Sequence, residues 1–284
     1  MYILLPFRLA VRLKIHIMKL YYPHALHVKP VRKLFSANKM ESSAFRRYTE
    51  EKHTRKATDM IYMADSASAS DVRSLIELFP IEGVTTNPTI ITREKGDLRT
   101  LLTDMRKAIG PDMMLHVQTM QTEACAMVRE ALALKEALGG NFYVKIPATA
   151  QGLKAIRLLK AQHVQVTATA IFSAQQALLC ARAGADFVAP YVNKLSDICV
   201  DAISVVGEIV RLFDTFALPA RVLSASFRNV DQVNQVALMG SHAITLPVPF
   251  YDKLIAHPMT DLALIGFESD WHSVYGEKKP EDML

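Results

Sequence analysis

The chain has 284 residues, of which 50% are apolar, 21% charged and 8% aromatic, so it can bury a substantial core and does not have the composition of a disordered protein. One globular domain, or at most two, is the expectation. The three cysteines form no even framework and no Cys/His cluster, which argues against a disulfide-stapled secreted module and a structural zinc site. No uninterrupted apolar stretch approaches the ~18 residues of a membrane span.

The positive charge is confined to the first part of the chain. Residues 1–59 hold 13 Lys and Arg against four Asp and Glu, whereas residues 60–284 hold 20 against 24, so the net charge of +5 becomes −4 for the body. A mildly acidic body gives no electrostatic footprint for a phosphate backbone, and we expect no nucleic-acid partner.

Residues 1–59 mix apolar and basic residues with no sustained period of 3.6 or 2, and we expect a non-domain extension rather than a folded unit. One interpretation is a targeting segment, because the N-terminus is basic and initially free of acids. The other is an upstream in-frame extension that is not natively translated, with Met60 as the natural start. The domain proper is expected over residues 60–284.

From residue 61 onward, eight short apolar runs predict strands. They alternate with longer amphipathic segments that predict helices, and strict alternation implies parallel strands with right-handed crossovers. The predicted strands are Ile61–Asp65, Gly83–Thr86, Met113–Thr119, Phe142–Ile146, Val164–Thr169, Phe187–Ala189, Arg221–Ser224 and Ala243–Thr245. The predicted helices are Ser70–Phe79, Leu98–Ala108, Thr122–Leu138, Gly152–Ala161, Ala174–Ala183, Ile198–Phe213 and Val230–Met239.

Eight such units within about 225 residues match an α/β fold of the (β/α)8 TIM-barrel type, followed by a C-terminal helical tail. No GxGxxG or P-loop opens any of the helices, which disfavours a nucleotide-binding Rossmann fold. The active site of such a barrel lies at the carboxyl ends of its strands. Polar residues that end the apolar runs are therefore the candidates for chemistry.

Lys145 is the outlier among these strand ends, because apolar strand-forming residues flank it. One interpretation is a buried ion pair with an inward carboxylate such as Asp65. The other is a Schiff-base nucleophile, since burial lowers the pKa of an amine and supplies its free form near neutral pH. The lack of metal ligands at the other strand ends favours the second interpretation, because the iminium can serve as the electron sink.

For each of the remaining polar residues at strand ends, a purely structural role is an alternative to a catalytic or binding role. Asp65 is either an acid/base group or a helix N-cap, although Ser68 and Ser70 are available for capping. The Thr85-Thr-Asn87 string is a site element or an ordinary turn, and Gln118 and Thr169, read singly, are satisfied polar residues. Tyr191 is a site residue or a rim aromatic. Ser226 and Arg228 suit an anion site, and the alternative for Arg228 is a solvated surface arginine. The scattered histidines are interpreted as structural or surface residues.

Several strings together resemble the transaldolase family, and within it the small fructose-6-phosphate aldolase type. The specific ones are Gly83-Val-Thr-Thr-Asn-Pro88 and Val144-Lys-Ile-Pro147, and the likeness covers about residues 61–276. Further matches are Asp65, Val117-Gln118, Thr167-Ala-Thr-Ala170, Val188-Ala-Pro-Tyr-Val-Asn193, Ala225-Ser-Phe227, Ile244-Thr-Leu-Pro247 and Phe267-Glu268 with Asp270-Trp271.

The resemblance implies a class I mechanism without metal or cofactor. Lys145 would form the carbinolamine and then the iminium with a ketose, and Asp65 would bind or deprotonate its C4 hydroxyl. Gln118 and Thr169 would position a water, with which Tyr191 would act as acid/base. The expected substrate-binding residues are Asn87 and Thr85 for donor hydroxyls, and Lys194, Ser226 and Arg228 for the terminal phosphate.

Two positions discriminate within the family. Transaldolases proper resemble one another in having a carboxylate at the position of Gln118 and a phenylalanine at that of Tyr191, so this chain resembles the aldolase branch. A phenol with a bound water offers a proton route for release of free dihydroxyacetone. Lys194 and Arg228 depart from the family, which usually has arginine at the first and often lysine at the second, and a planar fork and a point charge are not equivalent anion partners.

The prediction is a cytoplasmic class I aldolase that cleaves or forms fructose 6-phosphate from dihydroxyacetone and glyceraldehyde 3-phosphate. The alternatives are a transaldolase that transfers dihydroxyacetone between sugar phosphates, an aldolase for a modified ketose such as a sulfonated one, and a catalytically silent sugar-phosphate-binding barrel. The expected partner is a small sugar phosphate, with no membrane partner. The resemblance also implies a homo-oligomer, often a decamer, with the Phe267 to Trp271 tail packed on a neighbouring subunit.

Overall fold

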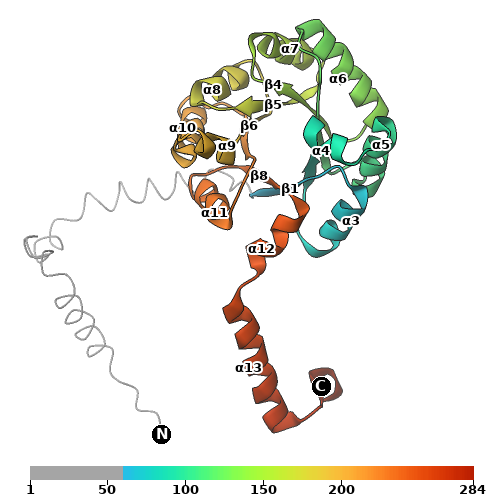
Figure 1. Ribbon diagram of the computed structural model, residues 1–284, viewed down its shortest axis with the longest axis vertical. Helices are drawn as coiled ribbons and strands as arrows, with labels where there is room; N and C mark the ends of the chain where they lie inside the picture. The colour runs from blue at the N-terminus through green and yellow to red at the C-terminus, as the bar shows by residue number, and fades with distance from the viewer. Residues whose placement is uncertain (1–59) are drawn as a thin grey trace, which may run out of the picture. The chain divides into compact units, whose positions relative to one another are not determined.

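The computed structural model describes residues 60–284 (Figure 1). The expectations for residues 1–59 lie outside the described residues. Eight parallel strands form a closed barrel in chain order, and the barrel closes where β1 pairs with β8, with Ile61 opposite Ala243. The strands are β1 (Ile61–Asp65), β2 (Gly83–Thr85), β3 (Met114–Gln118), β4 (Phe142–Pro147), β5 (Gln165–Ile171), β6 (Phe187–Pro190), β7 (Arg221–Ser224) and β8 (Ala243–Leu246).

A ring of helices surrounds the barrel (Figure 1). Each crossover between consecutive strands contains at least one helix, and this confirms the predicted (β/α)8 fold. These helices are α3 (Ala69–Leu78), α4 (Pro88–Arg93), α5 (Leu98–Ile109), α6 (Ala124–Leu138), α7 (Ala150–Lys160), α8 (Ala174–Arg182), α9 (Val192–Asp197), α10 (Ala202–Thr215) and α11 (Val230–Leu238).

Two short helices differ from the prediction. Helix α4 stands where the Asn-Pro dipeptide was given the alternative of an ordinary turn, and helix α9 follows β6 directly. The predicted helix Ile198–Phe213 begins later, at Ala202, because Asp201 caps α10 by accepting from the backbone N–H of Ser204. Both short helices lie at the carboxyl ends of their strands, where they border the barrel mouth (Figure 1).

The strands bury both of their faces. One face packs under the helices and contributes residues such as Val84, Leu115 and Val144, all fully buried. The other face fills the barrel interior with an apolar cluster made of Ile61, Met63, Met114, Tyr143, Phe187, Leu223 and Ala243. Because side chains alternate along a strand, the inward position after Tyr143 on β4 is Lys145. The alternation of side chains along β4 therefore places the Lys145 side chain inside the barrel.

The chain continues past β8 through the 3-10 turn η2 (Val248–Phe250), helix α12 (Tyr251–Ile255), helix α13 (Pro258–Tyr275) and the 3-10 turn η3 (Pro280–Asp282). The predicted C-terminal helical tail is thus confirmed. Helix α13 has no buried residue and lies outside the ring of helices. Among residues 60–284, no helix is both long and apolar enough to cross a membrane.

Candidate active site

The amine of Lys145 lies inside the carboxyl end of the barrel. The side chain is 5% exposed, and its Nζ donates a hydrogen bond of 2.7 Å to the carbonyl oxygen of Thr86, just after β2. Burial lowers the pKa of the ammonium, and the charge of Asp65 opposes that shift. Within the described chain no ion pair joins Lys145 to Asp65, so the buried-ion-pair alternative does not describe this lysine.

Asp65 ends β1 and is held by a chain of hydroxyl groups. The Thr85 hydroxyl donates to Asp65 Oδ1 at 2.6 Å and lies 2.7 Å from the hydroxyl of Thr245. Since Thr85 spends its single proton on Asp65, Thr245 is the donor in the second bond. The N-cap of α3 is Ser68, so Asp65 does not cap that helix.

The pKa of the Asp65 carboxyl group is raised, and the pKa of the Lys145 amine is lowered. Burial raises the pKa of Asp65, and Lys145, Thr85 and Arg93 partly offset that rise. An acid with a raised pKa and an amine with a lowered pKa have pKa values that are closer together than usual. A proton therefore moves between such groups at a smaller free-energy cost. This pairing is typical of acid/base sites.

Tyr191 and Thr169 meet across the next part of the mouth. The Thr169 hydroxyl and the Tyr191 hydroxyl are 3.0 Å apart, and burial raises the pKa of the phenol. The phenol ring packs edge-on against Phe172, with centroids 5.7 Å apart, and Lys194 Nζ lies 5.0 Å above the ring. Tyr191 is therefore held by contacts on several sides, with its hydroxyl inside the site.

A cavity of about 580 Å³ opens at this end of the barrel, within the range of small-molecule sites. Two further predicted residues, Thr85 and Thr169, adjoin it through the hydrogen bonds given above. Arg228 is not among its lining residues and is exposed. The predicted site residues that the structure brings together around the cavity are Asp65, Asn87, Gln118, Lys145, Tyr191, Lys194 and Ser226.

Asn87 has a structural task as well as a place in the cavity. Its Oδ1 accepts from the backbone N–H of Ile90 at 3.0 Å and caps α4, and Pro88 occupies the first turn of that helix. The cap fixes the amide with its NH₂ group available as a donor. Asn87 is therefore both the turn element that the sequence allowed and a lining residue of the site.

Backbone strain accompanies the site. Ser226 has φ of 62°, and Ala170, directly after Thr169, has φ of 56°, a region that residues with a Cβ seldom occupy. Such positions cost on the order of 1–3 kcal/mol each and persist where the surroundings enforce them. The Ser226 carbonyl accepts a 2.6 Å bond from the backbone N–H of Asn193, which ties the end of β7 to α9.

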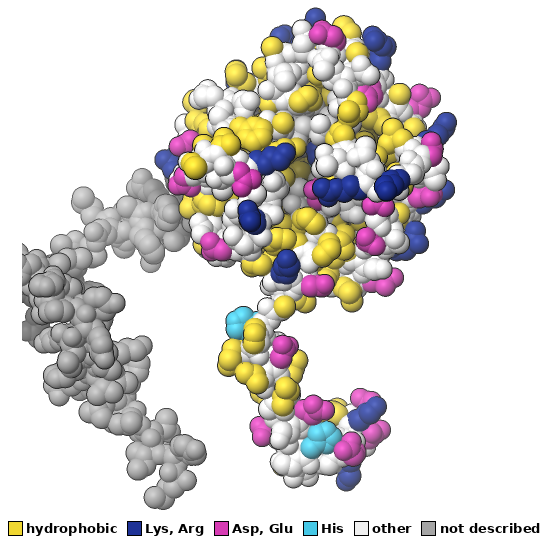
Figure 2. Space-filling model, in the orientation of Figure 1, with side chains coloured by type: hydrophobic (Ala, Val, Ile, Leu, Met, Phe, Trp, Pro, Cys, Tyr) yellow, Lys and Arg dark blue, Asp and Glu magenta, His cyan; other side chains and the backbone are white. Residues whose placement is uncertain are grey.

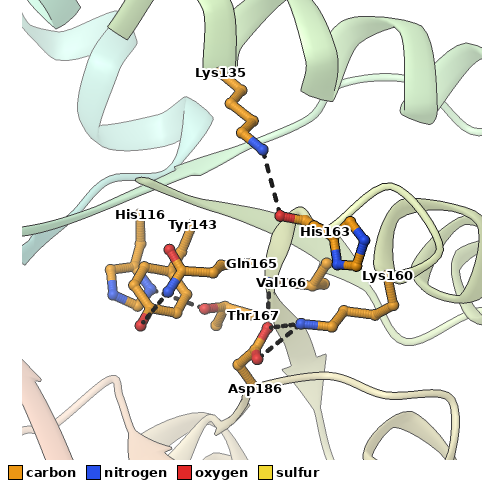
Figure 3. Close-up of polar contacts among 9 residues, drawn as sticks. All are labelled: His116, Lys135, Tyr143, Lys160, His163, Gln165, Val166, Thr167 and Asp186. Carbon is orange, nitrogen blue, oxygen red and sulfur yellow. Dashed lines mark hydrogen bonds and ion pairs between the residues drawn. The ribbon is translucent and has the colours of Figure 1, made fainter. Parts of the chain in front are cut away.

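A polar cluster lies one inward position before Lys145 along the strands, because His116 pairs with Tyr143 on β4; Figure 3 shows its contacts. His116 is fully buried, its Nδ1 lies 2.8 Å from the Thr167 hydroxyl, and its ring stacks on Tyr143 with centroids 4.5 Å apart. Burial, followed by the charge of Lys145, lowers the pKa of His116 well below its usual value, so the imidazole is neutral. His116 is thus a buried structural residue, one of the two roles expected for the histidines from the sequence.

Figure 3 also shows the outer end of this cluster. Lys160 Nζ donates to both carboxylate oxygens of Asp186 at 2.8 Å, and the backbone N–H of Val166 donates to Asp186 Oδ2 at 2.7 Å. This bridge joins α7, β5 and the start of β6. Among residues 60–284, no three His, Cys, Asp or Glu side chains gather as a metal-binding group.

Three charged residues that line the cavity were not predicted from the sequence: Arg93, Glu94 and Asp71. Arg93 and Glu94 lie at the end of α4, six and seven residues beyond the Asn87 cap, and Asp71 lies in the first turn of α3. A search confined to the residues that end the strands cannot find them. The signal that was available is the Asn-Pro dipeptide itself, because Asn at the N-cap and Pro at the first helical position mark a helix start.

A closed (β/α)8 barrel with a buried lysine in its mouth defines the class of protein. Comparison with known families is consistent with that class: the pattern of the Transaldolase/Fructose-6-phosphate aldolase family matches residues 62–280. The chain belongs to this family of aldolase and transaldolase enzymes.

Solved structures show more distant likeness. A double variant of flavocytochrome b2 with sulfite bound is 12% identical, with a TM-score of 0.50 over 68% of this chain and 57% of that chain. Thiamine phosphate pyrophosphorylase from Pyrococcus furiosus is 16% identical, with a TM-score of 0.48 over 66% and 85% of the two chains. At 12% identity, the likeness to the flavocytochrome b2 variant concerns the fold alone.

Proposed function

We propose that the protein is a class I aldolase that cleaves or forms fructose 6-phosphate from dihydroxyacetone and glyceraldehyde 3-phosphate through a Schiff base on Lys145. The observation that carries this proposal is the amine itself. It is buried, its pKa is lowered by that burial, and it bonds to the neutral carbonyl of Thr86 instead of a carboxylate. A free amine in a cavity of sugar size is what Schiff-base chemistry requires.

The first step is attack of Lys145 Nζ on the C2 carbonyl of the ketose. The amine loses a proton as the carbinolamine forms, and loss of water then gives the iminium. Tyr191 and Gln118 line the cavity, and Thr169 bonds to the Tyr191 hydroxyl, so these three are suited to position the water and move its protons. Family resemblance gives them the same roles.

The second step breaks the bond between C3 and C4. Asp65 accepts the proton of the C4 hydroxyl, the C4–O bond becomes the aldehyde carbonyl, and the electron pair of the broken bond enters the iminium to give an enamine. The raised pKa of Asp65 makes it a stronger base than an exposed carboxylate once it is ionised. The Thr85 hydroxyl holds its carboxylate in place during this transfer.

The third step protonates the enamine at C3, after which hydrolysis releases dihydroxyacetone. Tyr191 carries this step in the proposal, because its phenol is neutral at physiological pH and acts as a proton donor. Asn87, with Thr85 nearby, holds the donor hydroxyls. Lys194, Ser226 and Arg228 receive the terminal phosphate, although Arg228 is exposed and does not line the cavity.

A transaldolase is the second candidate, because membership of the family fits either reaction. A sulfonated ketose is a further candidate, since Lys194 stands where the family usually has arginine. The test is release of glyceraldehyde 3-phosphate from fructose 6-phosphate, with and without erythrose 4-phosphate as acceptor. The aldolase proposal expects release without the acceptor, and strict dependence on the acceptor would replace it by the transaldolase.

We also propose that the protein is a cytoplasmic homo-oligomer. The three cysteines, Cys125, Cys180 and Cys199, are all free thiols, which suits a reducing compartment. Helix α13 exposes Met259, Leu262, Ile265 and Phe267 to between 60% and 68% (Figure 2). An exposed apolar helix gains stability when a second copy covers it, since helices draw most of their stability from packing.

A further inference from the structure

Strand β5 contains a bulge where it reaches the active site. Ala168 pairs with Val188 of β6. The next pair joins Ile171 to Pro190, so β5 holds one residue more than β6 between the two pairs. Within this stretch Ala170 has φ of 56° and no register partner on a neighbouring strand of the described sheet. A bulge leaves backbone groups outside the hydrogen-bonded ladder, so the N–H of Ala170 is available for a contact outside the sheet.

The phenol oxygen of Tyr191 makes that contact. The backbone N–H of Ala170 bonds to it, and the Thr169 hydroxyl lies 3.0 Å from it. Tyr191 is also tied to β5 through its backbone, since its N–H donates to the carbonyl oxygen of Ile171 at 3.2 Å. Phe172 packs edge-on against the phenol ring. Four consecutive residues of β5 and the segment after it therefore fix the position of this one side chain.

The hydrogen-bond inventory of Tyr191 shows what these contacts do. Burial raises the pKa of the phenol, whereas the Thr169 hydroxyl and the Ala170 N–H lower it, as donors to its oxygen do. The Thr169 hydroxyl has no other hydrogen-bond partner within the described chain. A phenol oxygen has lone pairs for two donors and one proton of its own. With both lone pairs used by β5, the proton of Tyr191 is left for the cavity that this residue lines.

We propose that the bulge of β5 is an anion hole for Tyr191, in which the Thr169 hydroxyl and the Ala170 N–H stabilise the phenolate that forms when Tyr191 protonates the enamine. The inference rests on the proposed aldolase function. In this step the O–H bond of the phenol breaks and its electron pair stays on oxygen. The enamine electrons form the C–H bond at C3, and the nitrogen of Lys145 becomes an iminium again. Hydrolysis of that iminium by water releases the proton that returns to the phenolate.

The nearby carboxylate does not oppose the phenolate at this stage. Ionised Asp65 raises the pKa of the phenol, but in the proposed sequence Asp65 has already taken the C4 proton and is neutral. The two donors of β5 are fixed by the strand before the reaction begins, so they stabilise the new charge without reorganising. Ala170 touches neither substrate nor reacting atoms, and it is a positioning residue that acts through Tyr191.

The direct test removes the N–H of Ala170 alone. Lactic acid incorporated at this position of the full chain keeps the methyl group and replaces the amide by an ester. Cleavage of fructose 6-phosphate is expected to fall by about 10-fold or more, the scale of a lost donor to an anion. Transfer to added erythrose 4-phosphate should rise relative to release of dihydroxyacetone, and the borohydride adduct on Lys145 should persist.

The matched control is the same exchange at Ala217, which also has a positive φ, of 48°, and is exposed outside the cavity lining. Its N–H donates to the carbonyl oxygen of Asp214 at 3.2 Å, so the control also loses a backbone hydrogen bond. The ratio of cleavage to transfer should not change there. In the Tyr191→Phe background the ester at Ala170 should have no further effect on cleavage. An equal fall with and without the phenol would overturn the inference, because that loss would be structural.

A second measurement needs no ester and remains informative if the ester variant does not fold. Amide hydrogen exchange at Ala170, resolved by mass spectrometry, is compared between the wild type and Tyr191→Phe, which keeps the ring. Exchange should be about 10-fold or more slower in the wild type, because only there does the N–H have an acceptor. Equal rates would overturn the inference and leave the aldolase function standing. Slow exchange without a borohydride adduct on Lys145 would overturn the aldolase function and the catalytic role of the hole.

Discussion

Lys145 and Asp65 depend on each other for their protonation states. Burial pushes the amine and the carboxyl group toward their neutral forms, and the mutual attraction of their charges pushes both toward their ionised forms. Neither group is neutralised by direct contact, because Lys145 bonds to Thr86 and Asp65 accepts from Thr85. Each therefore keeps a lone pair that can reach a substrate.

Tyr191→Phe tests the route by which the enamine is released. The change removes the hydroxyl that bonds to Thr169 and leaves the ring that packs on Phe172. If the phenol donates the proton, cleavage of fructose 6-phosphate should fall by about 10²-fold or more, the usual scale for a general acid. Schiff-base formation on Lys145 should survive, and transfer to an added aldehyde should rise relative to release of free dihydroxyacetone.

Thr169→Val is the companion variant for this prediction. It removes the partner hydroxyl and keeps the phenol, so its effect should go in the same direction and be smaller. Both rates are measured in one assay with erythrose 4-phosphate present or absent. A ratio of cleavage to transfer that stays the same in Tyr191→Phe would remove this residue from the proton route.

At the scale of elements, the strands were predictable and the short helices were not. Each predicted strand coincides with an observed one to within two residues, because strands with both faces buried are seen in the sequence as apolar runs of three to seven residues. Helices α4 and α9 have six residues each, which is too short for a helical period to show. The predicted helix over 198–213 therefore merged the loop after α9 with α10.

The same distinction applies to the residues of the site: those at strand ends were predictable, and those on the short helices were not. Lys145, Asp65, Gln118 and Tyr191 lie at strand ends, so the fold alone locates them once the strands are known. Arg93 was missed because it sits at the end of an unpredicted helix and looks like any solvated arginine. The stacking of His116 on Tyr143 was also beyond the sequence, since strand alternation gives the side of the barrel and not the contact across it.

For the whole molecule, helix α13 makes the oligomer testable. Its 18 residues include none that are buried, and Figure 2 shows apolar side chains along it. Light scattering on the full chain should give a mass that is a multiple of 31.7 kDa. The double variant Ile265→Glu with Phe267→Glu should shift the protein toward the monomer, because it places two charges where we propose a dry contact.

The control for that measurement is Gln162→Glu, which adds one charge at an exposed position outside α13 and should not change the mass. A wild type that stays monomeric at all concentrations tested would refute the oligomer. So would a double variant that keeps the full oligomeric mass.

Borohydride trapping tests whether Lys145 is the nucleophile. The wild type, Lys145→Met and the exposed-lysine control Lys154→Met are each incubated with fructose 6-phosphate and borohydride, and the labelled peptide is then mapped by mass spectrometry. One reduced adduct, on Lys145, is expected in the wild type and in Lys154→Met, and none in Lys145→Met. An adduct on another lysine, or a wild type that cleaves the substrate without any adduct, would contradict it.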